Sequence, residues 1–157
     1  MKHKRLTIVA VVAIVGAIGV GSAVATPGSG VLGAPVLARG TLDGHFKIKL
    51  RDSSKSGDVA VQQVILAPGG STGWHTHLGP AVVIVKSGSF TLYDGDDPSC
   101  TGSTYSAGKV FVDQGYGHVH IGRNEGSTNT ELYVTYLDVP PSELPRVDAP
   151  DPGNCGF

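Results

Sequence analysis

The chain has 157 residues, enough for one domain with a sizeable core but too few for two. Its 12 Lys and Arg residues stand against 13 Asp and Glu residues, which gives a formal net charge of −1. Beyond its first five residues the chain has no excess or cluster of basic residues, which makes it a poor candidate for binding nucleic acid. The sequence also lacks the glycine-rich fingerprints of P-loop and dinucleotide-binding proteins.

The N-terminus has the pattern of a secretory signal peptide. Basic residues lie among the first five positions, an apolar run extends from Leu6 to Ala25, and the run ends in the small residues Ala23-Val24-Ala25. We therefore expect residues 1–25 to be a signal peptide that is cleaved after Ala25. The alternative is an uncleaved membrane anchor, because about 20 apolar residues can just span a bilayer. In both cases the rest of the chain is expected to be extracytoplasmic, either secreted or anchored at the cell surface.

The remainder of the chain has the pattern of a β protein. Residues 26–35 are rich in glycine and proline and indicate a linker. Short segments with alternating or β-branched residues follow, separated by turn sequences such as PGG, KSGS and DGDD. These segments are FKIKL (46–50), VAVQQVIL (59–66), AVVIVKSG (81–88), SFTLY (89–93), KVFVD (109–113), HVHIG (118–122) and ELYVTYL (131–137). We expect an all-β sandwich or barrel over residues 36–140. Prolines end the pattern and leave a polar tail over residues 141–157.

The two cysteines, Cys100 and Cys155, lie in turn-like sequence in the part that would be exported. In an oxidising compartment an even number of cysteines predicts disulfide bonds, so we expect these two to pair. The bond would tie the C-terminal tail to the loop after residue 94. In the chain-entropy model, closing a loop of about 55 residues stabilises the fold by roughly 3–4 kcal/mol.

Four histidines form two H-x-H pairs, His75 with His77 and His118 with His120. Residues i and i+2 on a strand point to the same face, so each pair can direct two imidazoles into one space. If the two strands are neighbours, the nitrogens can converge on one metal ion, and imidazole suits zinc, copper, iron and nickel. The alternative is that these are polar residues at strand ends. His45 stands alone in a turn-like sequence and is expected at the surface.

These residues carry a resemblance to the cupin family. Gly69, His75, His77 and Gly88 match the first cupin motif, G-x5-H-x-H-x3,4-E-x6-G. The second motif ends in G-x2-H-x3-N, which GHVHIGRN matches from residue 117 to residue 124. The resemblance covers roughly residues 58–139 and implies a cupin-type double-stranded β-helix, or jelly-roll, barrel. It also implies a divalent transition metal, such as iron, copper, zinc, nickel or manganese, bound by His75, His77 and His120.

The sequence departs from the family pattern at the glutamate of the first motif. That position falls on Ala81 or Val82, and neither side chain can ligate a metal. The resemblance is therefore to a three-histidine cupin, with His118 as an alternative fourth ligand. Three neutral imidazoles would leave the charge of the metal uncompensated and favour an anionic or chelating ligand. A third possibility is that the metal was lost together with the glutamate.

The resemblance implies two functions. The first is a small-molecule and metal-binding cupin that acts as an oxygen-dependent oxidoreductase of the dioxygenase kind. The second is a non-catalytic extracytoplasmic module that binds a small molecule without turning it over, which the missing glutamate and the apolar run Ala81–Val85 favour. For the enzyme, the sequence shows no acid or base near the histidines. A homodimer is a further expectation from the family. A membrane partner is expected only if the N-terminal segment is not cleaved.

Overall fold

The computed structural model describes residues 29–30, 32–50 and 57–157. The expected signal peptide, residues 1–25, and the first residues of the expected linker lie outside the described residues. The chain divides into two compact units, Met1–Ala34 and Pro35–Phe157, and the fold is that of the second unit. Within the described residues, no helix combines the length and the hydropathy needed to cross a membrane.

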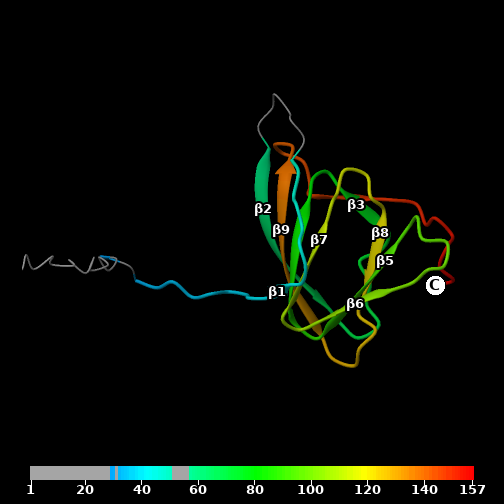
Figure 1. Cartoon of the computed structure of the whole chain (residues 1–157), viewed down its shortest axis with the longest axis horizontal. Coiled ribbons are helices and arrows are strands. Elements are labelled where there is room, and N and C mark those ends of the chain that lie inside the picture. Colours follow the sequence, from blue (N-terminus) through cyan, green and yellow to red (C-terminus); the bar gives the residue numbers. More distant parts are fainter. Residues whose placement is uncertain (1–28, 31, 51–56) are drawn as a thin grey trace, which may run out of the picture. The chain divides into compact units, whose positions relative to one another are not determined.

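The described part of the second unit consists of strands joined by turns (Figure 1). In chain order the strands are β1 (Thr41–Leu42), β2 (Asp58–Leu66), β3 (His75–His77), β4 (Ala81–Ser87), β5 (Ser89–Asp94), β6 (Ser103–Ser106), β7 (Lys109–Asp113), β8 (His120–Arg123), β9 (Thr130–Val139) and β10 (Arg146–Asp148).

These strands form two sheets within the described residues, each of five strands. One sheet has the order β1-β7-β4-β9-β2 and the other has the order β10-β3-β8-β5-β6. From β2 to β9, the chain crosses repeatedly between the sheets, and the pairing within this set is antiparallel. This strand order is that of a double-sheet jelly roll. The predicted all-β, double-stranded β-helix fold is therefore confirmed.

The core lies between the two sheets because alternate residues of each strand point inward. Every second side chain is buried over residues 81–85 of β4 and 130–136 of β9. The sequence ELYVTYL of β9 alternates in step with this burial, whereas AVVIV of β4 is apolar throughout. The buried core residues are Ala81, Val83, Val85, Phe90, Phe111, Leu132, Val134, Tyr136 and Val139. A second buried cluster joins Trp74, Ile121 and Cys155, and it lies beside the disulfide between Cys100 and Cys155. The disulfide expected from the two cysteines is thus present.

Three expected elements differ in the structure. Residues 46–50 alternate in sequence but form no strand, and Phe46 and Leu50 are exposed. A strand needs a hydrogen-bonded neighbour, and this segment has none among the described residues. The strand expected over 118–122 begins only at His120. The polar tail, expected to be irregular, contributes β10, which pairs with the exposed edge of β3.

Candidate metal centre

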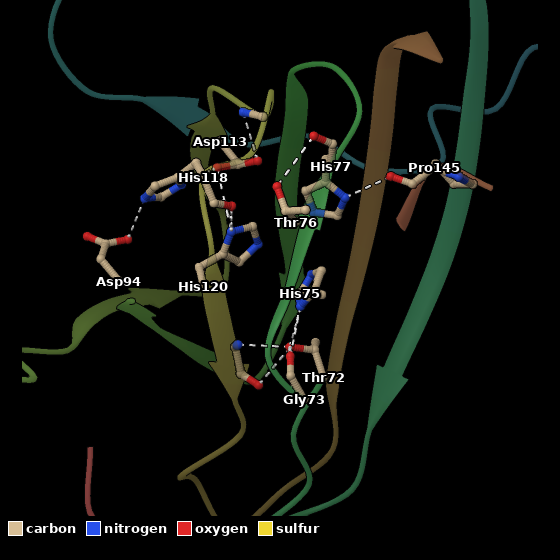
Figure 2. Close-up of polar contacts among 12 residues, drawn as sticks. Thr72, Gly73, His75, Thr76, His77, Asp94, Asp113, His118, His120 and Pro145 are labelled. Atoms are coloured by element: carbon tan, nitrogen blue, oxygen red, sulfur yellow. Dashed lines mark hydrogen bonds and ion pairs between the residues drawn. The ribbon is translucent and has the colours of Figure 1, made fainter. Parts of the chain in front are cut away.

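Three histidines lie close together on the inward face of the sheet β10-β3-β8-β5-β6, because β3 and β8 are neighbours in it. His75 and His77 lie on β3 with both side chains buried, and His75 is paired in register with His120 of β8. The ring centroids lie 4.4 Å apart for His75 and His120, 4.9 Å for His75 and His77, and 5.1 Å for His77 and His120. One nitrogen of each ring lies within 4.8 Å of the other two. Figure 2 shows the three rings grouped in this way.

Each of these imidazoles is oriented by a backbone carbonyl. Nδ1 of His75 lies 2.8 Å from the carbonyl oxygen of Gly73, and Nδ1 of His77 lies 2.9 Å from that of Pro145. Nδ1 of His120 lies 3.3 Å from the carbonyl oxygen of His118. A carbonyl only accepts hydrogen bonds, so Nδ1 carries the proton in all three rings. The lone pair of each neutral ring is then on Nε2. Metal-binding histidines in proteins are held by the same kind of contact.

Burial keeps these rings neutral. It lowers the pKa of His75 from 6.5 to about 3, with a further contribution from the nearby His120. It lowers the pKa of His120 to about 4 and also lowers the pKa of His77. A neutral imidazole is the form that binds a metal, so protons compete weakly for this site at neutral pH.

An acidic residue beside the histidines was not predicted from the sequence. Asp113, at the end of β7, is 3% exposed, and its Oδ1 lies 3.7 Å from Nδ1 of His120. Burial alone would raise the pKa of Asp113, but the hydrogen bond from His118 and the neighbouring imidazoles outweigh it and lower the pKa. The expectation that no acid lies near the histidines was therefore wrong. The signal was present in KVFVD, where Asp113 shares the inward face of the strand with Phe111.

His118 lies outside the three-histidine group. Its Nδ1 donates to Oδ1 of Asp113 at 2.6 Å, and its Nε2 lies 3.3 Å from Oδ1 of Asp94 (Figure 2). Its side chain is 32% exposed, and the hydrogen bond to Asp113 raises its pKa. Both ring nitrogens thus face carboxylates, which favours the three-histidine arrangement over a fourth imidazole ligand. Asp113, His118 and His120 form a second group of closely spaced ligand atoms. Within it, Asp113 and His118 are hydrogen-bonded to each other, so these two groups are engaged without a metal.

Residues on two neighbouring strands flank Ala81, which stands at the glutamate position of the motif. Ala81 is fully buried, and its partners across the sheet are Tyr136 of β9 and Asp113 of β7. The ring of Tyr136 lies 5.1 Å from that of His77, and its hydroxyl donates to Oε1 of Gln62 at 3.0 Å. An aromatic ring therefore lies beside the histidines, close to the position where the motif would have placed a carboxylate.

A small cavity inside the barrel reaches the three histidines. Its volume is about 50 Å³, and Asp113 and Tyr136 line it together with the histidines. Its remaining wall is largely apolar and includes Val83, Phe90, Phe111, Leu132 and Val134. Asp113 also borders a groove of about 330 Å³, which Asp94 and His118 line as well.

The donor set fits a divalent transition metal. Three neutral imidazoles with Nδ1 protonated offer three Nε2 lone pairs, and such nitrogen sites suit zinc, copper, iron and nickel. The apolar wall of the cavity would limit the access of water to the ion.

Asn124, Trp74 and His45 do not belong to the groups of ligand atoms around His120. Asn124 is fully buried, and its amide joins Leu66 to Thr128 while its oxygen accepts from the amide of Gly126. Trp74 is a buried aromatic of the second cluster. His45 is exposed, as expected.

Comparisons with known proteins found matches among solved structures. No family model matches the chain, and no curated protein matches it. Among solved structures, an uncharacterized conserved protein with a double-stranded beta-helix domain from Klebsiella pneumoniae is 19% identical, with a TM-score of 0.49, over 62% of this chain and 75% of that one.

Two further structures have similar values. A cupin domain from Bordetella pertussis is 23% identical, with a TM-score of 0.44, over 55% of this chain and 86% of that one. A predicted oxalate decarboxylase from Thermotoga maritima is 25% identical, with a TM-score of 0.41, over 50% of this chain and 64% of that one. These three structures are what the chain is similar to, and similarity at this level says nothing about activity.

Proposed function

We propose that this protein binds a divalent transition metal through the Nε2 atoms of His75, His77 and His120. One observation carries the proposal: each of these buried rings has its Nδ1 hydrogen-bonded to a backbone carbonyl, so the metal-binding nitrogens are the remaining ones. Three protein ligands leave coordination positions for a small molecule, as in catalytic metal sites. The resemblance to cupins implies iron, copper, zinc, nickel or manganese.

The first candidate function is an oxygen-dependent oxidoreductase that acts on a small chelating molecule. A bound divalent metal would supply Lewis acidity for an anionic or chelating oxygen ligand. The protein would contribute a dry compartment, because the cavity wall is mostly apolar. Asp113 would contribute a negative charge beside His120 and keep His118 hydrogen-bonded at the barrel wall.

The second candidate function is a module that binds a small molecule without transforming it. Two polar groups near the histidines support it, because both are already engaged in hydrogen bonds. Asp113 accepts from His118 and from the amide of Gly115, and the hydroxyl of Tyr136 donates to Gln62. A group that acts as a general base must reach the substrate instead. The small cavity also restricts the size of a ligand that can enter fully.

Metal binding is tested by elemental analysis of untagged protein and by titration of the metal-free protein with Co²⁺, followed by visible absorption. We expect stoichiometric binding by the native protein and its loss in His75→Ala and His120→Ala. The matched control is His45→Ala, because that histidine is exposed and lies outside the cluster. Absence of binding by the native protein to any of the five metals would overturn the proposal.

The two functions are separated by oxygen uptake. Protein loaded with Fe²⁺ or Cu²⁺ is given a panel of diketones, thiols and flavonols, and the His120→Ala variant serves as the control. Oxygen consumption by the native protein alone supports the oxidoreductase. A silent panel, together with a change in melting temperature on adding one of these compounds, supports the binding module.

We further propose that the protein is extracytoplasmic. The disulfide between Cys100 and Cys155 supports an oxidising compartment. The mass of the exported protein tests cleavage after Ala25, since a mass that still includes residues 1–25 would contradict it. The homodimer stays a prediction, which sedimentation of the purified protein would test.

A further inference from the structure

The C-terminal segment, residues 140–157, forms a strap across the edge of the sheet that carries the histidines. Its strand β10 pairs antiparallel with β3, and Arg146 lies opposite His77 while Asp148 lies opposite His75. The strand with two of the proposed ligands therefore has β8 on one side and the strap on the other. Figure 1 shows this red segment leaving β9 in the first sheet and continuing past β3 of the second.

The strap also supplies the group that orients one of the ligands. The carbonyl of Pro145 accepts the hydrogen bond from Nδ1 of His77 at 2.9 Å (Figure 2). His75 and His120 are oriented by carbonyls only two residues before them, at Gly73 and His118. His77 thus depends on a segment 68 residues away, and the core jelly roll by itself lacks this contact.

Few apolar contacts hold the strap. Leu144 and Val147 are 77% and 43% exposed, whereas Cys155 is buried against Trp74 and Ile121. The ring of Phe157 contacts Tyr93 and Arg123 but is itself 47% exposed. Besides the pairing of β10 with β3, the polar contacts to the strap include Ala149 N to Trp74 O, Arg146 Nη2 to Thr72 O, and Asn154 Nδ2 to the carbonyls of Asp94 and Asp97. The covalent link is the disulfide from Cys155 to Cys100. A segment with so little buried apolar area is expected to detach at low cost once that link is opened.

We propose that the strap is part of the metal centre and that the disulfide controls the affinity of the centre for metal. This inference rests on the proposed function. Opening the bond requires a dithiol reductant: its thiolate attacks Sγ of Cys100, the half-buried partner, and Cys155 leaves as a thiolate and takes a proton. The second thiol of the reductant then releases Cys100, so the protein gains two thiols and the reductant becomes a disulfide. The freed strap withdraws the Pro145 carbonyl from His77.

The hydrogen bond itself is tested without metal. In native protein with ¹⁵N-labelled histidine, the protected Nδ1–H signals of His75 and His77 are followed by NMR. In the Cys100→Ser/Cys155→Ser variant we expect the His77 proton to exchange with solvent at least about tenfold faster, while the His75 proton is unchanged. A His77 signal with native exchange in this variant would overturn the inference, whatever the protein does with metals.

The effect on the site is tested by Co²⁺ titration of the same variant. Serines are used because free thiols would bind the metal themselves. Loss of a contact that orients a ligand typically weakens metal binding about 10–100-fold, so we expect the Kd for Co²⁺ to rise by that factor. Val85→Ala is the control for general destabilisation, because Val85 is a fully buried core residue away from the strap. Its Kd should stay within about threefold of the native value.

Arg146→Ala provides a second way to loosen the strap with the disulfide intact, since Arg146 donates to the carbonyl of Thr72. It should change the Kd and the exchange of His77 in the same direction, which keeps the test decisive if the double variant does not fold. If native protein binds Co²⁺ and both strap variants bind it equally well, the strap inference fails alone. If native protein binds no metal, the proposed function fails, and the NMR measurement still reports on the strap.

Discussion

His75 and His120 lie directly opposite each other across the β3–β8 pair, with their ring centroids 4.4 Å apart. Side chains of directly opposed residues project from the same face of a sheet. A shift of the register by one residue would turn one of the two rings to the other face. The proposed metal centre therefore depends on the register between β3 and β8, because this register places His75, His77 and His120 on the same face of the sheet.

Metal ions should stabilise the folded protein. A ligand that binds only the folded state adds about 2.7 kcal/mol to the free energy of unfolding at a concentration 100 times its Kd. Thermal unfolding with and without Zn²⁺ measures this as a rise in melting temperature that a chelator reverses. The His120→Ala variant should show no rise. An equal rise in that variant would mean that the ion binds elsewhere.

The stability of the metal-free protein should decrease as the pH falls from 7 to 4. Burial lowers the pKa of His75 to about 3 and the pKa of His120 to about 4, whereas a histidine in the unfolded chain has a pKa of 6.5. Below pH 6.5 the unfolded chain binds protons that the folded protein does not. Each such histidine then removes up to about 1.4 kcal/mol of stability per pH unit. Above pH 6.5 both states are neutral at these positions, and the stability is fully present.

Urea unfolding at pH 7.5 and pH 5.0, in the presence of a chelator, measures this dependence. His118 acts in the opposite direction, because the hydrogen bond to Asp113 raises its pKa, but its partial exposure makes the contribution smaller. His75→Gln should have a shallower pH dependence than the native protein, because it removes one of the buried titrating groups. Equal stability of the native protein at both pH values would contradict the prediction.

Gly122→Ala should destabilise the fold. A Cβ atom at this position would lie 1.9 Å from Cζ of Phe90, whose ring stacks on Phe111 in the core. Overpacking of this kind typically costs about 1–3 kcal/mol. Chemical denaturation measures the loss. Gly156→Ala is the control, because a Cβ atom there would meet nothing within 4 Å, and its stability should match that of the native protein.

Asn124→Ala should destabilise the fold more than an ordinary surface substitution. The buried side chain donates to the carbonyls of Leu66 and Thr128 and accepts from the amide of Gly126. Each buried partner left unsatisfied costs about 1–3 kcal/mol. Asn124→Asp keeps the acceptor but loses the donor, so it separates the two contributions. A loss below about 0.5 kcal/mol on denaturation of Asn124→Ala would show that water replaces these contacts.

The strands that alternate strongly could be predicted from the sequence, because their periodicity reports burial on one face. The segments predicted over 59–66, 81–88 and 131–137 correspond to β2, β4 and β9. The short strands β6 and β10 have no such pattern. They exist because a neighbouring strand offers an open edge, β5 for β6 and β3 for β10, and sequence periodicity carries no information about that.

Part of the candidate site could also be predicted from the sequence, because the period of two residues along a strand determines which side chains share a face. The H-x-H spacing places His75 and His77 on one face, and the structure brings His120 to them. His118 does not share a strand with His120, since β8 begins one residue after Val119. The carbonyl of Pro145 comes from a distant part of the chain, so only the three-dimensional arrangement reveals it. The inward face of Asp113 can be read from KVFVD, but its place beside His120 depends on how β7 and β8 come together.

Asp113 borders both the inner cavity and the outer groove. Leu92 borders both spaces as well, so these two side chains form the wall between them. We expect a shorter side chain in place of Asp113 to connect the groove with the cavity and so give small molecules a second route to the histidines. The range of molecules admitted to the centre could thus change by one substitution, with every imidazole left in place.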